Sequence, residues 1–338
     1  MVAKRLFVSI FGLVIAGAIF ISSTPAQADL KMRLEWTPIL IHSWYFLAEK
    51  NGWYAEEGVR VTFEPGAGSV NTTQIVAAES HDIGQASHSA MTVGRSKQGL
   101  KVKAIASLIR RNEMGILVPK DSGWKSPKDL VDNNVKIVTS PGGFDTPFFE
   151  SWFRLSGTNV KRATFLNVDP KLKGSTYIGK KGDAISTSPA FFNAIFGTKR
   201  PSDFFMMSEA GLNMPGTGII ASEKAIREKP DEIRGFLKAT MRAFDHIIGG
   251  KNYEDGYNAI VEMRKEFKMP KGMVLAQFKD HERLGLWVTD ATKGKPWGFM
   301  APEDWGSAIK VMTDAKVIAA GHSPTEFYTN DLQPAATN

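Results

Sequence analysis

Residues 30–36, with the sequence LKMRLEW, alternate apolar and polar side chains, which is the periodicity of a β-strand with one buried face. A helical stretch follows at 43–50, and Gly58 ends the next turn before a second strand at 59–63. The alternation continues with a helix at 70–79, a strand at 82–85, a helix ending near 98 and a strand at 102–108. Strands and helices in this order predict a parallel sheet with helices on both faces.

A second α/β unit is predicted from residue 116 onward, where 116–119 is typical of a strand that leaves the first unit. Ser126 and Pro127 open a helix, as an N-cap residue and a proline at the first helical position do. The other predicted elements of this unit are strands at 135–139, 165–168 and 184–186 and helices at 147–155 and 189–195. Residues 218–221 are predicted to return to the first unit, and the clearest helical periodicity after them covers 230–248.

These patterns predict an α/β protein of two lobes with a hinge and a central cleft. The first lobe is discontinuous and comprises residues 29–118 plus 216–338, and residues 119–215 form the second lobe. The chain is expected to cross between the lobes near 115–120 and 215–220. Because ligands of open α/β sheets bind outside the carboxyl ends of the strands, we expect the binding site in the cleft.

The N-terminus has the three parts of a secretory signal peptide, predicted over residues 1–28. Lys4 and Arg5 precede an almost wholly apolar run at 6–21, and Ala26-Gln27-Ala28 supplies small residues at the cleavage positions. The apolar run is shorter than the roughly 20 residues that a spanning helix needs. We therefore expect export to the periplasm rather than an N-terminal membrane anchor.

Composition excludes several kinds of chemistry. The chain has no cysteine, so a lipid-anchored N-terminus, disulfides, thiolate zinc sites and cysteine nucleophiles are all excluded. Its formal net charge is +7, without the block of like charges that is typical of a nucleic-acid-binding arm. The six histidines show no metal-ligand spacing, and we find no catalytic motif. The sequence therefore predicts no catalytic residue, no metal site and no cofactor.

Six short motifs occur in an order that one known family shares. They are Trp36-Thr37-Pro38 followed by His42, 48–59 (AEKNGWYAEEGV), 82–84 (DIG), 121–123 (DSG) with 126–130 (SPKDL), 167–170 (NVDP) and 182–184 (GDA). With these motifs the sequence resembles the periplasmic solute-binding proteins of ABC importers for sulfonates, nitrate, taurine and the pyrimidine precursors of thiamine. The resemblance implies a type II periplasmic-binding-protein fold that closes around its ligand. It also implies an ABC permease and its ATPase as partners.

The yeast thiamine-pyrimidine synthases share this fold, and three positions distinguish them. The synthases carry a lysine where this chain has Ala86, a histidine where it has Ala90, and a cysteine cluster where 213–217 (NMPGT) stands. The lysine Schiff base and the iron-binding thiolates that the synthase chemistry needs are missing. We therefore expect a binding protein, and a synthase-like enzyme is the less favoured alternative.

Candidate ligand-binding residues of the first lobe lie where its strands end. Trp36 ends the first strand, and its ring either stacks on a flat ligand or packs under the first helix. His42 begins that helix as a ligand contact or as a cap. Gly68 and Ser69 open the next helix, where backbone N–H groups favour an anion or simply form a turn. The remaining first-lobe candidates are Trp44, Gln85 and Ser87.

The matching loop of the second lobe is 140–146 (SPGGFDT). Its two glycines let the backbone approach a ligand closely, whereas Phe144 and Asp145 make a bulky anion less favoured. The second-lobe candidates are Gly142, Gly143, Phe144, Asp145, Thr146, Ser186 and Thr187.

The candidate residues favour a flat heteroaromatic ligand, such as a pyrimidine precursor, because they combine rings with mostly neutral hydrogen-bonding groups. The alternative is an anion of the sulfonate, taurine or nitrate type. Arg110 and Arg111, near the first crossing, either clamp a carboxylate or sulfonate or serve as surface charges or an interlobe salt bridge.

We expect the precursor to be cut after Ala28, because the small residues at 26–28 fit a signal peptidase. N-terminal sequencing of the secreted protein should then begin at Asp29. Retention of residues 1–28 in a membrane fraction would contradict this expectation.

Overall fold

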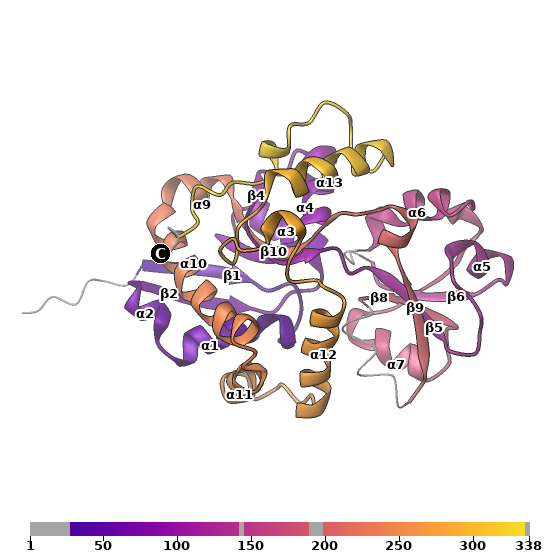
Figure 1. The fold of residues 1–338 in the computed structure, drawn as a ribbon, viewed down its shortest axis with the longest axis horizontal. Helices are drawn as coiled ribbons and strands as arrows, with labels where there is room; N and C mark the ends of the chain where they lie inside the picture. The colour runs from indigo at the N-terminus through magenta and orange to yellow at the C-terminus, as the bar shows by residue number, and fades with distance from the viewer. Residues whose placement is uncertain (1–27, 142–144, 189–198, 335–338) are drawn as a thin grey trace, which may run out of the picture.

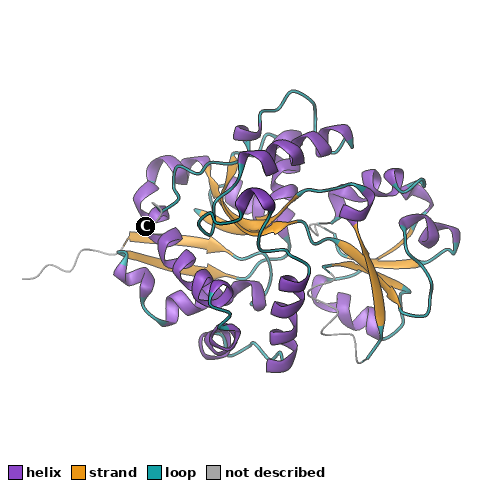
Figure 2. Cartoon of the chain, in the orientation of Figure 1, coloured by secondary structure: helices purple, strands orange, loops and turns teal. Residues whose placement is uncertain are grey.

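The structure is a computed structural model that describes residues 28–141, 145–188 and 199–334. Its strands form two five-stranded sheets, one in each of two lobes (Figure 1). Helices lie on both sides of each sheet, as Figure 2 shows. The predicted fold class, two α/β lobes, is confirmed.

The first sheet has the strand order β2-β1-β3-β10-β4. Strands β1 (Ala28–Arg33), β2 (Val59–Glu64) and β3 (Ile83–Ser87) are parallel, and β10 (Pro215–Ser222) is antiparallel to both β3 and β4 (Val102–Arg111). The four strands that were predicted to be parallel run in the same direction, and the returning strand β10, whose direction was not predicted, makes the sheet mixed. The chain returns from the second lobe and enters the sheet at the edge where β3 and β4 end, so β10 must run in the opposite direction.

The second sheet has the order β7-β6-β8-β5-β9. Its strands are β5 (Gly115–Pro119), β6 (Lys136–Thr139), β7 (Thr164–Asn167), β8 (Ala184–Thr187) and β9 (Ser202–Met206). Strand β6 is parallel to β7 and β8, whereas β5 is antiparallel to β8 and β9. The strands predicted near 135, 165 and 184 are all present.

The first lobe carries most of the helices that the structure describes. They are α1 (Ser43–Lys50), α2 (Trp53–Glu56), α3 (Ser69–Ala77), α4 (His88–Gln98), α9 (Glu223–Glu228), α10 (Pro230–Phe244), α11 (Tyr253–Met263), α12 (Lys271–Arg283) and α13 (Pro302–Asp314). The second lobe carries α5 (Pro127–Asp132), α6 (Phe149–Leu155) and α7 (Lys173–Ile178). The helix predicted over 230–248 is α10 continued by a π-helical turn, Asp245–Gly249. The helix predicted at 189–195 lies outside the described residues.

The chain crosses between the lobes at two places. Residues 112–114 join β4 to β5, and residues 207–214 join β9 to β10. The predicted boundaries at 118/119 and 215/216 lie next to these crossings and stay predictions.

Helix α13 also connects the lobes without a covalent link. One buried apolar cluster contains Trp305 and Ile309 of α13 together with Trp152 of α6. At the end of α13, the carbonyl oxygen of Ala315 accepts hydrogen bonds from Ser151 Oγ at 2.7 Å and from Arg154 at 2.6 Å. The second lobe is thus held by packing as well as by the two crossings.

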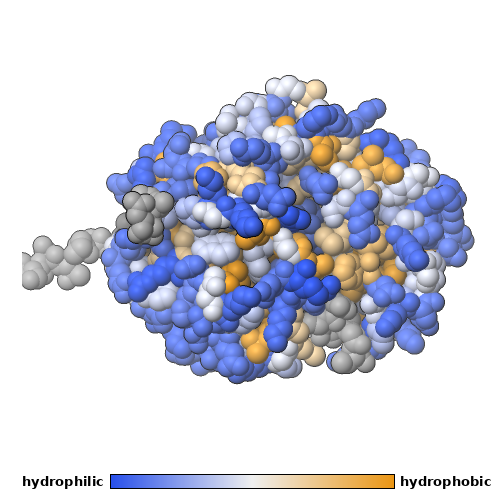
Figure 3. All heavy atoms as spheres, viewed as in Figure 1, coloured by the Kyte–Doolittle hydropathy of each residue, from blue (hydrophilic) through white to orange (hydrophobic). Residues whose placement is uncertain are grey.

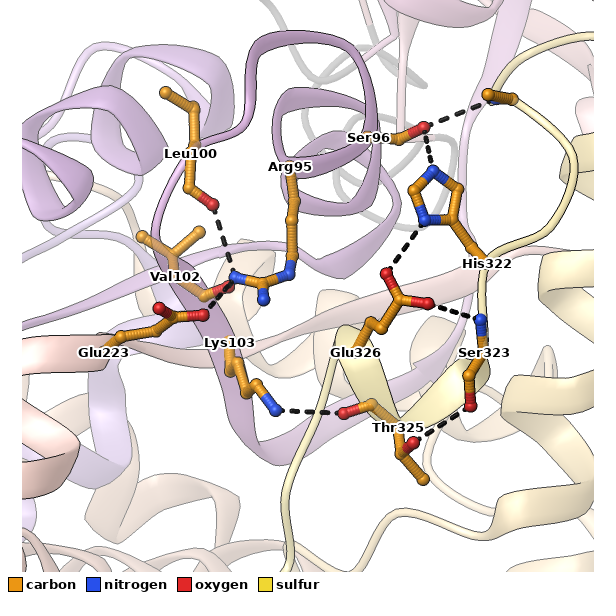
Figure 4. Close-up of polar contacts among 11 residues, drawn as sticks. Arg95, Ser96, Leu100, Val102, Lys103, Glu223, His322, Ser323, Thr325 and Glu326 are labelled. Carbon is orange, nitrogen blue, oxygen red and sulfur yellow. Dashed lines mark hydrogen bonds and ion pairs between the residues drawn. The ribbon is translucent and has the colours of Figure 1, made fainter.

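The segment after α13 is tied back to the first lobe near the end of α4 (Figure 4). His322 contacts Ser96 Oγ through Nε2 at 2.9 Å and Glu326 through Nδ1 at 3.0 Å. Lys103 donates to the carbonyl oxygen of Thr325 at 3.0 Å. These contacts explain His322 as a structural residue of the C-terminal segment.

Across residues 28–141, 145–188 and 199–334, the helices are all too short or too polar to cross a membrane.

Phe236 should be a major contributor to the stability of the first lobe. Its ring is fully buried and stacks on Tyr54 at 5.5 Å and on Tyr45 at 6.1 Å between centroids. We expect Phe236→Ala to lower the free energy of unfolding by about 3–5 kcal/mol, measured by chemical denaturation. Val261→Ala, at a partly exposed apolar position of α11, is the control and should change it by less than about 0.5 kcal/mol. Similar losses in the two variants would contradict this assignment.

Candidate functional site

A polar junction lies at the end of β1, where the loop before α3 and the end of β3 meet it. Glu35 follows β1 and has only 7% of its surface exposed. Ser69 Oγ donates to Glu35 Oε1 and accepts a 2.8 Å hydrogen bond from the backbone N–H of Ser87. The backbone N–H of Gly68 donates to the Glu35 carbonyl oxygen at 2.8 Å. The predicted Gly68, Ser69 and Ser87 are therefore brought together, and Glu35 is the residue that joins them.

A glycine is required where this loop touches the strand. A side chain at Gly66 would overlap the carbonyl oxygens of Leu34 and Glu35. The N–H of Gly66 donates to the carbonyl oxygen of Trp36 at 3.1 Å. The small-residue loop therefore serves to bring α3 onto the strand end.

Two carboxyl groups lie close together at this edge of the first sheet. Burial raises the pKa of Glu35 to about 7, the Ser69 hydroxyl opposes this shift, and the nearby Glu113 carboxylate adds to it. Glu113 lies in the first crossing and has 8% of its surface exposed. The edge is therefore rich in carboxyl oxygens, which can accept hydrogen bonds.

Glu113 contacts residues of both lobes. Its Oε2 accepts a 2.6 Å hydrogen bond from Ser188 Oγ, which follows β8 in the second lobe. The same oxygen lies 3.1 Å from His281 Nε2 of α12 in the first lobe. The sequence interpretation considered the arginines before Glu113 and missed this residue, although a charged residue just before the crossing predicted near 115–120 was a usable signal.

The second lobe contributes a buried carboxylate of its own. Ser186 Oγ donates to Asp145 Oδ2, and Lys173 Nζ lies 3.7 Å from the same oxygen. Thr187 is buried beside Ser186 at the end of β8, and Thr146 begins a 3-10 turn after Asp145. The predicted Gly142, Gly143 and Phe144 lie outside the described residues.

Gln85 and His42 are buried with polar atoms that find no partner in the described part of the chain. Both amide atoms of Gln85 are unpaired, and the side chain is fully buried on β3. His42 Nδ1 accepts a 3.0 Å hydrogen bond from the N–H of Ile39, which caps the 3-10 turn Leu40–His42, and its Nε2 is unpaired. Burial lowers the pKa of His42 to about 3, so the imidazole is neutral and Nε2 carries the hydrogen.

The two predicted tryptophans differ in their surroundings. Trp44 is fully buried in the first-lobe core, 4.9 Å from the ring of Phe244 and 6.4 Å from that of Trp287. Trp36 is half-buried at the strand end. The structure thus gives Trp44 a packing role, whereas Trp36 is only partly buried.

Arg110 does not point a free guanidinium at a ligand. It is buried, donates to the carbonyl oxygen of Pro296 at 2.9 Å, and lies 5.6 Å from the ring of Trp297. Burial lowers its pKa to about 10. Arg110 therefore anchors the segment after α12 to β4, which none of the three alternatives from the sequence foresaw.

A cavity of about 650 Å³ lies between the lobes. Its first-lobe wall is the start of α3, with Asn71 and Gln74, and its second-lobe wall is formed by Pro141 and the end of β7, with Asn167 and Asp169. On the face drawn in Figure 3, apolar surface gathers near the middle of the molecule, and hydrophilic residues cover its outer ends. The space between the lobes is large enough for a small molecule.

Two α/β lobes, two crossings and polar groups at facing strand ends define the fold of the periplasmic solute-binding proteins. An alkanesulfonate-binding protein SsuA from Xanthomonas axonopodis pv. citri has this fold at 11% identity and a TM-score of 0.67, with 91% of this chain and 99% of that chain covered. The family model described as "NMT1/THI5 like" matches residues 40–250. This chain belongs to that NMT1/THI5-like family.

Two relatives illustrate the range of the family. A formylaminopyrimidine-binding protein from Halalkalibacterium halodurans is 20% identical over 294 residues, which cover 85% of this chain and 86% of the relative. A 4-amino-5-hydroxymethyl-2-methylpyrimidine phosphate synthase from Legionella pneumophila is 23% identical over 259 residues, which cover 72% and 78%. The proteins similar over most of this chain's length include binding proteins, and an enzyme matches over a shorter part.

The burial of Glu35 should be visible in the pH dependence of stability. Its pKa is raised from 4.5 to about 7, so folding takes up a proton between these values and the free energy of unfolding falls as the pH rises through this range. In the wild type, this fall in the free energy of unfolding should be about 3 kcal/mol between pH 4.5 and 7. Glu35→Gln cannot titrate, so the variant should not show it. Glu266→Gln, at an exposed position, is the matched control and should keep the wild-type profile. Parallel profiles for wild type and Glu35→Gln, from chemical denaturation, would show that Glu35 is ionised in the fold.

Proposed function

We propose that this chain is the extracytoplasmic solute-binding component of an ABC importer. It captures a small molecule between its lobes and delivers it to a permease and its ATPase. The proposal is supported by family membership, by the two-lobed fold and by polar groups on both walls of the interlobe space. The signal peptide predicted at residues 1–28 supports the periplasm as the proposed location.

A binding role fits the residues better than the chemistry of the synthases. Ala86 and Ala90 are both buried next to the site, where neither side chain can form a Schiff base or move a proton. Met214 offers only a thioether in place of the thiolates. We therefore propose that this member of the family is not an enzyme.

The ligand class that fits best is a flat heteroaromatic ring with hydrogen-bond-donating nitrogens. The observation that carries this choice is the pair of buried carboxyls, Glu35 and Glu113, at the end of the first sheet, with Asp145 buried in the second lobe. These groups can accept hydrogen bonds from ring nitrogens. A sulfonate, taurine or nitrate ligand would place negative charge beside Glu35, where burial already disfavours a charge.

Trp36 would supply a stacking face for such a ring, and Gln85 could pair with both a donor and an acceptor on its edge. The relative that binds formylaminopyrimidine, an amino-substituted heteroaromatic by its name, is consistent with this chemistry. An aminopyrimidine is therefore the proposed ligand type.

A thermal-shift screen of the mature protein tests the ligand class. Formylaminopyrimidine and related aminopyrimidines should stabilise the protein by about 2.7 kcal/mol at 100 times the dissociation constant. Taurine and alkylsulfonates should give no shift, because they would place negative charge beside Glu35. The reverse response would overturn the proposed ligand class.

Trp36→Ala should weaken aminopyrimidine binding by about 0.5–1.5 kcal/mol, the energy of one ring contact, measured by isothermal titration calorimetry. Trp53→Ala is the matched control, since Trp53 lies on α2 beneath the guanidinium of Arg242, 4.1 Å from its ring centroid, and not at the strand ends. Equal affinities of the Trp36→Ala variant and the wild type would assign Trp36 to packing alone.

A further inference from the structure

One carboxylate oxygen joins the two lobes at the first crossing. Oε2 of Glu113 accepts from Ser188 Oγ at 2.6 Å, and it lies 3.1 Å from Nε2 of His281. Ser188 belongs to the second lobe, and His281 belongs to α12 of the first lobe. All three side chains are buried, so these contacts are little weakened by water.

The hydrogen bond made by Nδ1 of His281 determines which ring nitrogen carries a hydrogen. Nδ1 lies 2.8 Å from the carbonyl oxygen of Gln277, which can only accept, so Nδ1 carries a hydrogen. A neutral ring would then turn the lone pair of Nε2 toward the Glu113 carboxylate. Only the imidazolium, with hydrogens on both nitrogens, can donate to Gln277 and also form an ion pair with the Glu113 carboxylate, which lies 3.1 Å from Nε2. The ring is also held by stacking on Trp287, with centroids 5.0 Å apart.

The charged groups around His281 favour the imidazolium. Burial alone lowers the pKa of His281, but the Glu113 carboxylate, the Gln277 carbonyl and Asp280 on the same helix outweigh it, and the pKa is raised above 6.5. Glu35, which interacts with Glu113, has its pKa raised to about 7 and is therefore largely protonated at pH 6. These are the titratable and polar groups that the structure shows acting on the pair.

We propose that His281 is a positioning residue that, as an imidazolium, holds Glu113 against Ser188 and thereby latches the two lobes together. The latch is a property of the ligand-free chain and does not depend on which solute the cleft takes. It is complete below the ordinary pKa of histidine and is lost as the pH rises through the raised value. The other polar contact described above between the lobes, from Ser151 and Arg154 to Ala315, contains no histidine and should not open in this window.

The test is a measurement of the distance between the lobes as a function of pH. Because the chain has no cysteine, Gln98→Cys on α4 and Lys161→Cys in the second lobe, both exposed, allow two spin labels to be placed specifically. Double electron–electron resonance of the ligand-free protein should give a narrow distance distribution at pH 6. It should become longer and broader at pH 9.

Three variants separate positioning from general stability. His281→Leu should show the open distribution at both pH values, because its side chain cannot carry a positive charge beside Glu113. His281→Gln has no titratable group at this position, so its distribution should be the same at pH 6 and at pH 9. His246→Gln is the matched control, since His246 pairs with Asp255 at 2.7 Å on the surface of the first lobe alone, and it should behave as wild type.

Ser188→Ala removes the second-lobe contact without touching the ion pair and should also open the distribution at pH 6. Because serine and alanine are both small, this substitution should disturb the fold little. Melting temperatures of all variants would reveal any misfolding. A wild-type distribution that is unchanged between pH 6 and 9, or unchanged by both His281→Leu and Ser188→Ala, would overturn the latch. The thermal-shift screen tests the ligand separately, so failure of either experiment leaves the other standing.

Discussion

The insertion of β10 between β3 and β4 is the constraint on which the two-lobed structure depends. A chain that leaves a sheet at the end of one strand and returns beside that strand must re-enter it antiparallel, and the register of β10 against β4 shows this. The return is tight, because side chains at Gly216 and Gly218 would overlap the carbonyl oxygens of Ile109 and Ala106. Both crossings therefore leave from one edge of the first sheet, which makes that edge a hinge and places the facing strand ends across a cleft.

The same constraint explains why so many polar groups are buried at one place. Parallel strands β1 and β3 end at this edge, β4 ends there as well, and the second lobe shields the edge from solvent. An unpaired buried polar atom destabilises a fold by about 1–3 kcal/mol, and here Gln85 and His42 retain such atoms. A ligand or ordered water that pairs with them recovers this free energy on binding. Local departures from well-satisfied packing are expected at functional sites for this reason.

The sequence predicted the elements well because their signals are local. Apolar alternation at 30–36, the Ser126-Pro127 helix start and the periodicity of α10 are all fixed by nearby residues. The direction of β10 and the partners of Glu35 were not predictable in the same way, because they are set by residues far away in the chain. Glu35 occupies a polar position in the alternating strand and was not singled out from the sequence, whereas Ser69 and the loop before α3 cover it. Trp44, by contrast, was taken as a cleft residue because of its type, and the core of the first lobe surrounds it.

The electrostatics of the cleft follow from which charges are compensated. Asp145 in the second lobe has Lys173 and Ser186 as partners, and Glu113 has His281 and Ser188, so each of these carboxylates is stabilised within the protein. Among the hydrogen bonds described for the Glu35 carboxyl group, the partner is the Ser69 hydroxyl, which carries no charge. The raised pKa of Glu35 agrees with the lack of a cationic partner in these contacts. A proton on Glu35 can be supplied by solvent or, equivalently, by a donor on the ligand. In the empty site, the buried Glu35 carboxyl group must take up a proton from solvent. An N–H group of the ligand that donates to Glu35 would take the place of this proton. Recognition of a ring with such donors is therefore coupled to the burial of this carboxyl group.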